Sequence, residues 1–247
     1  MKIALGVEYL GTHFHGWQIQ KSGIRTVQSV VETALSTVAN HPVRVYCSGR
    51  TDAGVHAKEQ VIHFETEAVR ESKAWLFGGN VNLPSDVNFT WVKKVGDDFH
   101  ARFNAYARAY EFKILNHPVR SALKADSHLW EPRPLDIEKM QKAANLLLGE
   151  HDFSCFRDSL CQAKSPIKTI EYLSITKHDG TVLLKVKANA FLHHMVRNIV
   201  GTLLKVGRGE RDICWMKDVL DSKDRRKAGP TSEPQGLYFV KAFYTDL

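Results

Sequence analysis

Large apolar residues occupy every second position at the start of the chain. The apolar positions from Ile3 to Tyr9 fall on one face of an extended segment, and smaller or charged residues fall on the other. This period of two predicts a strand with one buried face. From residue 27 to residue 38, valine, alanine and leucine recur at helical spacing, which predicts an amphipathic helix. Thr26 precedes this segment and can cap its first turn.

The rest of the first half continues with the same two periods. The patterns predict strands over residues 43–47, 61–64 and 87–93, and a second helix over residues 69–80. The predicted order of the first half is therefore strand, helix, strand, strand, helix, strand.

The second half repeats this order. Its patterns predict strands over residues 106–115, 168–177, 181–188 and 236–244, and helices over residues 136–148, 192–206 and 212–220. Asp179-Gly180 lies between two of these strands and is a strong hairpin signal.

Two successive β-α-β-β-α-β segments predict two split βαβ units of the ferredoxin-like kind. The hairpins make the sheet mainly antiparallel, so the predicted class is α+β. We place the boundary near residues 103–105, which predicts a first half over 1–104 and a second over 105–247.

Composition narrows the class of protein. Of the 247 residues, 43% are hydrophobic and 25% are charged, which is ordinary for a folded domain. No uncharged apolar run reaches the ~18 residues of a membrane span, and Glu8 interrupts any signal-peptide core. The four cysteines form no CxxC pair, which indicates reduced thiols in the cytoplasm. The net charge of +7 suits a polyanionic partner such as a nucleic acid, but charge alone does not decide this.

The segment 48–57 is the strongest candidate for chemistry. It directly follows a predicted strand, and Gly49 and Gly54 bracket Arg50 and Asp52. Glycines let a backbone approach a ligand closely, and a carboxylate beside a base can stay ionised as a nucleophile or base. By its local pattern alone, Thr-Asp-Ala-Gly is more often an ordinary turn.

The predicted strand that begins near residue 106 places aromatic and basic side chains on one face. Tyr106, Arg108, Tyr110 and Phe112 share this face. Such a face can stack a base and hold a phosphate. An aromatic strand packed in a core, with Arg108 at its rim, explains the pattern equally well.

The predicted helix near residue 192 offers His193, His194 and Arg197. The two histidines are a weak metal signal, because neighbouring residues on a helix do not face each other. If Arg197 is buried, it needs an anion, and a catalytic carboxylate could be that partner. The alternative is a surface arginine on an amphipathic helix.

Two basic stretches lie near the C-terminus, over residues 205–211 and 223–227. They are compatible with a phosphate-binding rim. A solvated loop is the more frequent explanation of such charge runs.

The motifs together resemble those of the TruA-type tRNA pseudouridine synthases. The resemblance begins with Gly49-Arg50-Thr51-Asp52-Ala53-Gly54-Val55-His56 and extends over nearly the whole chain, with no motif residue missing. The further motifs are Phe99-His100-Ala101-Arg102-Phe103, Arg108-Ala109-Tyr110, Gly149-Glu150-His151-Asp152-Phe153, residues 191–198 and Gly236-Leu237-Tyr238.

The resemblance implies a fold, a reaction and a partner. It implies the pseudouridine-synthase fold, built from two ferredoxin-like halves, and a homodimer without cofactor or metal. The implied reaction is the isomerisation of uridine to pseudouridine at positions 38, 39 and 40, in the anticodon stem-loop of tRNA.

The resemblance also implies roles for particular residues. Asp52 would be the carboxylate that starts exchange of the glycosidic bond, and Tyr110 would stack on the target uracil. Arg197 would pair with Asp52 and keep it ionised, and Arg50 would guide the flipped nucleotide or contact its phosphate.

Two alternatives from other classes stay open. A non-catalytic RNA-binding module on the same scaffold would bind tRNA without isomerising it. A metal-dependent hydrolase using Asp52 and His56 would lose activity with a chelator, although the metal-ligand spacing is poor.

Overall fold

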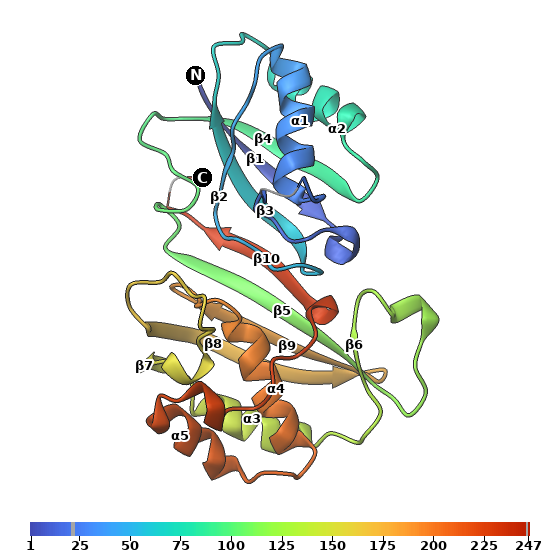
Figure 1. Cartoon of the computed structure of the whole chain (residues 1–247), viewed down its shortest axis with the longest axis vertical. Coiled ribbons are helices and arrows are strands. Elements are labelled where there is room, and N and C mark those ends of the chain that lie inside the picture. Colours follow the sequence, from blue (N-terminus) through green and yellow to red (C-terminus); the bar gives the residue numbers. More distant parts are fainter. Residues whose placement is uncertain (21–22, 246) are drawn as a thin grey trace. The chain divides into compact units, whose positions relative to one another are not determined.

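The computed structural model describes residues 1–20, 23–245 and 247. They form two compact units, residues 1–106 with 238–247 and residues 107–237, which are described in turn (Figure 1). The halves 1–104 and 105–247 stay a prediction about domains that fold separately. The two units above only describe which residues pack together. In this grouping, residues 238–247 join the first unit, where Tyr238 and Phe239 of the last strand pair with His56 and Ala57.

The first unit contains a sheet with the strand order of a ferredoxin-like domain. Its central strand β1 is antiparallel to β3 on one side and to β4 on the other. β2 pairs antiparallel with one part of β3, and β10 pairs parallel with another part, at His56 and Ala57. The strands are β1 (Lys2–Tyr9), β2 (Tyr46–Cys47), β3 (His56–Glu65), β4 (Val87–Val95) and β10 (Leu237–Phe243).

Helix α1 (Val27–Ala39) begins where the sequence predicts. The Thr26 side chain accepts a hydrogen bond from the Ser29 amide, and the Ser29 hydroxyl accepts one from the Thr26 amide. This reciprocal cap satisfies two amide groups at the helix start that otherwise lack partners.

Two predicted elements of the first unit differ from the observed ones: one is shorter, and the other begins and ends later in the chain. The strand predicted over 43–47 is reduced to β2, because the Val43 amide donates to Ser36 Oγ and the Val45 amide to Glu32 Oε1. Side chains of α1 thus replace a neighbouring strand. The helix predicted over 69–80 becomes a π-helical turn (Ala74–Gly78) followed by α2 (Gly79–Asn82). Val69 lies outside it and is 80% exposed.

The second unit is built on the sheet order β5-β9-β8-β7. The β5–β9, β9–β8 and β8–β7 pairings are antiparallel, and β6 adds a short parallel pairing on β5. Asp179 and Gly180 both have positive φ in the predicted hairpin. The strands are β5 (Ala107–Asn116), β6 (Leu129–Glu131), β7 (Gly149–Asp152), β8 (Ile167–His178) and β9 (Thr181–Ala188).

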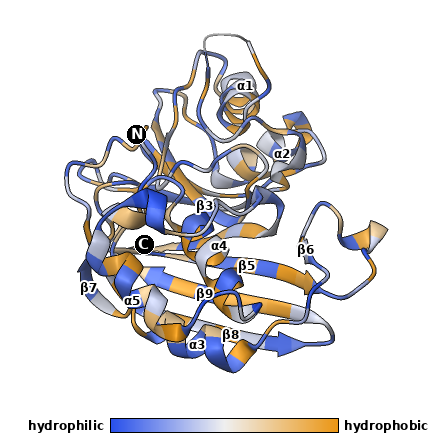
Figure 2. Ribbon diagram, turned by 60° about the horizontal axis from the view of Figure 1, so that its bottom comes forward, coloured by the Kyte–Doolittle hydropathy of each residue, from blue (hydrophilic) through white to orange (hydrophobic). Residues whose placement is uncertain are grey.

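Three helices belong to this unit: α3 (Ile137–Asn145), α4 (Met195–Gly207) and α5 (Ile213–Ser222). Figure 2 shows hydrophilic and hydrophobic residues mixed along α3 and α5, as expected for amphipathic helices. α4 packs closely on α3, since a Cβ on Gly207 would lie 2.5 Å from Met140 Sδ. The predicted α+β class with a mainly antiparallel sheet is confirmed.

One buried histidine in the first unit is held neutral by its surroundings. His63 is 3% exposed, stacks on Tyr46 with ring centroids 5.1 Å apart, and contacts His100 at 4.6 Å. Its Nδ1 accepts a hydrogen bond from the Ala101 amide at 3.1 Å. Burial, assisted by the nearby charges of His100 and Lys2, lowers the pKa of His63 to about 4.

We expect this histidine to make the first unit sensitive to mild acid. The folded protein binds the His63 proton only near pH 4, whereas the unfolded chain binds it near pH 6.5. The contribution of this pKa difference to stability is therefore fully present above pH 6.5 and is lost as the pH drops towards 4, by about 3 kcal/mol. The check is the free energy of unfolding of wild type and His63→Asn, measured by chemical denaturation across this range. The variant should show a weaker pH dependence.

His178→Asn is the matched control, because the His178 side chain is 89% exposed. It should retain the full pH dependence of wild type. Identical pH profiles for His63→Asn and wild type would contradict the assignment.

Candidate active site

The loop that carries Asp52 runs between β2 and β3, and its first residues are fixed by a buried glutamine. Gln60 is fully buried. It accepts from the Ser48 hydroxyl at 2.5 Å and donates from Nε2 to the Gly49 carbonyl at 2.5 Å. Arg50 is exposed, two residues before the half-buried Asp52. The loop therefore leaves β2 along a defined path.

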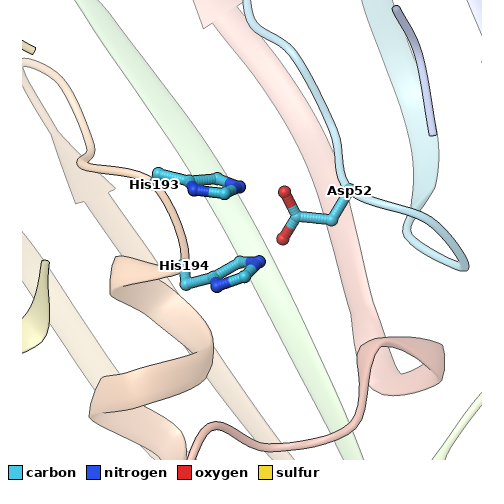
Figure 3. A group of neighbouring side chains, drawn as sticks. All are labelled: Asp52, His193 and His194. Atoms are coloured by element: carbon cyan, nitrogen blue, oxygen red, sulfur yellow. The ribbon is translucent and has the colours of Figure 1, made fainter. Parts of the chain in front are cut away.

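A second loop, residues 11–17, supports the first from beside it. The Trp17 amide donates to the Thr51 carbonyl at 3.0 Å, and the Gly54 amide donates to the Phe14 carbonyl at 3.3 Å. The Thr51 hydroxyl lies 2.8 Å from Tyr9 Oη. These contacts fix the backbone on both sides of Asp52, whose side chain Figure 3 shows on this loop.

The two loops approach so closely that one position requires glycine. Gly16 has a φ of +82°, and a Cβ there would lie 2.7 Å from the Thr51 carbonyl oxygen. A larger residue would be strained and would also push against the loop that carries Asp52.

His56 belongs to the structural frame of this loop. It is 1% exposed, its Nδ1 accepts from the Gly11 amide at 3.0 Å, and its ring stacks on Tyr238 at 4.6 Å. This position at the start of β3 favours a packing role for His56 over the hydrolytic role considered from the sequence.

Tyr110 lies on β5 of the second unit, opposite Val186 of β9. Its ring meets Phe191 edge to face, with centroids 4.9 Å apart. Arg108 donates from Nη1 to the Asn189 carbonyl at 3.2 Å, whereas Phe112 is fully buried. On the predicted aromatic face, Phe112 is therefore part of the hydrophobic core, whereas Tyr110 and Arg108 are half-buried.

The two histidines of the second unit precede α4 instead of lying on it. His193 and His194 form a turn, in which His194 has a φ of +60°, and the helix begins at Met195. Adjacent rings can therefore stack, with centroids 4.0 Å apart (Figure 3). The expectation that neighbouring histidines face apart on a helix is wrong here, because neither residue is yet helical.

A carboxylate that the sequence did not indicate lies beside both rings and forms a hydrogen bond with the ring of His194. Asp158 Oδ2 lies 2.8 Å from His194 Nδ1, and Oδ1 lies 3.4 Å from His193 Nδ1. Burial alone would raise the pKa of Asp158. The hydrogen bonds from the Leu160 amide and from His194 outweigh burial, and the pKa is lowered. Asp158 therefore stays ionised beside the two imidazoles.

Arg197 lies on α4 and is held by the segment 228–232. Its Nε donates to the Ser232 carbonyl at 2.8 Å, while the Ser232 amide and hydroxyl donate to the Arg197 carbonyl at 3.2 and 3.0 Å. A guanidinium anchored through Nε has a defined direction. The predicted pairing of Arg197 with Asp52 stays a prediction.

The same segment is bound to α4 through Asn198, which is completely buried. Asn198 Oδ1 accepts from Arg225 Nη2 at 2.9 Å and from the Thr231 hydroxyl at 2.7 Å. Arg225 also donates to the Gly229 carbonyl at 2.8 Å. The view of residues 223–227 as a solvated loop is therefore wrong for Arg225, which is a structural residue.

The comparisons with known proteins agree with these motifs. A sequence model of the family described as tRNA pseudouridine synthase matches residues 6–104 and 143–245. The chain belongs to the tRNA pseudouridine synthase family. Its enzyme class is accordingly that of the pseudouridine-forming isomerases, and the expected TruA type is confirmed by the relatives below.

Full-length relatives carry the same name. The chain is 52% identical over 246 residues to the tRNA pseudouridine synthase A of Alcanivorax borkumensis, covering 100% of this chain and 92% of the relative. It is 51% identical to that of Pseudomonas aeruginosa, covering 98% and 85%. The solved Cbf5–Nop10–Gar1 complex shows 15% identity and a TM-score of 0.39, covering 98% of this chain and 50% of that chain, which is too weak to define a fold.

The family assignment leaves the roles of single residues untested. Asp52, Arg50, Arg197 and Tyr110 remain predicted site residues, located on the loop before β3, on α4 and on β5. None of the helices formed by the described residues has the length and hydrophobicity to span a bilayer.

We expect Gly201→Ala to loosen the segment that holds Arg197. A Cβ on Gly201 of α4 would lie 1.7 Å from the Pro230 carbonyl oxygen, so the helix and the segment must separate. Overpacking of this kind costs about 2 to 3 kcal/mol. The measurement is the free energy of unfolding of the variant relative to wild type.

Gly78→Ala is the control, because a Cβ there would meet only Val38 Cγ2, at an ordinary 3.5 Å. It should be neutral or slightly stabilising. Equal stability of the two variants would show that the contact with Pro230 is not tight.

Proposed function

We propose that the chain isomerises uridine to pseudouridine at positions 38, 39 and 40 in the anticodon stem-loop of tRNA. Asp52 starts the reaction, the N1–C1′ glycosidic bond breaks, and a C5–C1′ bond forms. The C5 proton leaves to solvent and N1 takes up a proton, so that atoms balance and no electrons are exchanged. The reaction therefore needs no redox cofactor.

The observation that best supports this reaction is that the Asp52 loop is held by hydrogen bonds both at its beginning and farther along. Gln60 holds its beginning, and the Trp17 and Gly54 backbone hydrogen bonds hold its centre and end. A nucleophile or base gains most when its backbone is fixed before substrate binds. The family motif, with Arg50 two residues before Asp52, supports the same assignment.

Tyr110, Arg197 and Arg50 complete the proposed machinery. The phenol ring of Tyr110 would stack on the uracil, and its edge contact with Phe191 limits the positions it can take. Arg197, with its Nε anchored on Ser232, would present its remaining guanidinium N–H groups to the carboxylate of Asp52. Arg50, which is exposed, would contact the phosphate of the flipped nucleotide.

The chemistry explains why an enclosed aromatic site is needed. The uracil must detach, rotate and rejoin without attack by water. The nucleotide must also leave the stem-loop, at a cost of roughly a few kcal/mol in lost stacking. Stacking on Tyr110 would offset part of this cost.

We expect Asp52→Asn to bind tRNA but to lose turnover by at least about a thousandfold, because an amide is a poor nucleophile and base. The assay is tritium release from tRNA labelled at uridine C5, since formation of the C5 glycoside expels this label. A chelator is present throughout, which separates the isomerase from a metal-dependent hydrolase.

Asp126→Asn is the matched control, because Asp126 is exposed and has no proposed role. It should release tritium at the wild-type rate. Tyr110→Phe, which keeps the ring, should bind tRNA normally. Tight binding of tRNA by wild type without any tritium release would instead favour the non-catalytic RNA-binding module.

The proposal includes a homodimer that acts on tRNA in the cytoplasm. The family resemblance and the net charge of +7 support this partner. Light scattering should give twice the mass of the 28.0 kDa chain, and a monomer mass would exclude the dimer.

A further inference from the structure

The two basic stretches near the C-terminus meet around one open cavity of the second unit. The cavity measures about 410 Å³. None of the proposed site residues lines it. Its side chains include Lys205, Arg211, Trp215, Asp218, Arg226 and Lys227.

Four short pieces of chain bring these side chains together. Lys205 comes from the last turns of α4, and Arg211 from the turn that precedes α5. Trp215 and Asp218 lie three residues apart on α5, so they share one face of the helix. Arg226 and Lys227 belong to the short 3-10 helix Arg225–Lys227.

The local structure keeps this helix beside the cavity. Arg225, its first residue, is bonded to Asn198 and Gly229 and so ties the helix to α4. Asp224 accepts from Arg226 Nε and Nη2 at distances of 2.7 to 3.1 Å, which fixes the side chain of Arg226. Neighbours that do not line the cavity therefore hold the 3-10 helix and the side chain of Arg226 in place.

The charges around the cavity are unbalanced. Arg226 is paired with Asp224, and the three other cations of the lining face one carboxylate, that of Asp218. Within the part of the chain that the structure describes, no ion pair reaches Lys205, Arg211 or Lys227. Cations that surround one cavity repel each other, and an anion bound between them would relieve this repulsion. The guanidinium of Arg211 lies 5.3 Å from the centre of the Trp215 ring, so a cation and an aromatic face are available together.

We propose that this cavity binds the sugar–phosphate backbone of RNA at a point away from the target uridine. Lys205, Arg211 and Lys227 bind phosphates, and Trp215 offers its indole face to a ribose or base. That this RNA is tRNA rests on the proposed function. The site would supply affinity and orientation without taking part in the isomerisation.

An RNA strand fits the cavity better than a single small anion does. The cations come from three separate segments, which suits successive phosphates along a strand. The Trp215 surface would gain nothing from inorganic phosphate, but ribose and bases stack on indole.

The test removes two cations from the rim. Arg211 and Lys227 are both exposed, so Arg211→Gln with Lys227→Gln should leave the fold intact. With an unmodified tRNA transcript as substrate, we expect KM in the tritium-release assay to rise about tenfold while kcat stays unchanged. The slope of log Kd against log salt should become shallower by about 1.5, because each phosphate contact contributes roughly 0.7 to 0.9.

The matched control removes the same charge elsewhere. Lys93→Gln with Lys94→Gln takes two exposed lysines from β4 of the first unit. Its KM and salt slope should stay closer to wild type than those of the cavity variant. Equal effects of the two double variants would show only a general charge effect and would overturn the site.

A variant that should strengthen tRNA binding, instead of weakening it, provides the sharpest check. Asp218→Asn removes the one carboxylate of the cavity, and it should tighten tRNA binding about threefold, because a repulsive charge is lost. A merely structural role for Asp218 would weaken binding or leave it unchanged, and either result counts against the proposal.

The outcomes separate this inference from the proposed function. If wild type releases no tritium, the proposed function fails, while the binding and salt measurements still test the cavity. If wild type is active and the cavity variant has an unchanged KM and salt slope, only the cavity proposal fails. Inorganic phosphate that displaces tRNA more strongly than chloride at equal ionic strength, in wild type but not in the variant, would point to a small-anion site instead.

Discussion

The close approach of two backbone segments around Thr51 is the constraint on which the first unit depends. Its carbonyl accepts from Trp17, its hydroxyl pairs with Tyr9, and its neighbour Gly16 must lack a side chain. Tyr9 ends β1, so the loop is tied directly to the central strand of the sheet. This arrangement sets the position of Asp52, because hydrogen bonds hold the backbone on both sides of it.

Elements with a strong internal period could be predicted from the sequence, and elements defined by tertiary contacts could not. β1, α1 and the β8–β9 hairpin carry their own periodicity, cap or turn residues, and the structure confirms them. β6 and β7 are only three and four residues long, too short to show a period. The strand predicted over 43–47 is shortened because Ser36 and Glu32, side chains of the preceding helix α1, accept hydrogen bonds from its amides.

The same distinction applies to the candidate site. The loop around Asp52 and the residues Tyr110 and Arg197 stand in recognisable motifs, so the sequence could indicate them. Asp158 stands in no such motif, and only folding brings it to the stacked histidines. The interpretation of residues 223–227 as a solvated loop was wrong for Arg225 for the same reason. Its partner Asn198 lies on α4, and the sequence around Arg225 does not indicate this contact.

The way α1 replaces a neighbouring strand has a consequence for local opening. Gln28 donates to Glu32, which in turn accepts from the Val45 amide, while Ser36 accepts from the Val43 amide. These amides are protected from solvent exchange by side chains of a helix and not by a sheet ladder. We therefore expect the segment that leads to the Asp52 loop to open together with α1, because its opening breaks hydrogen bonds to that helix.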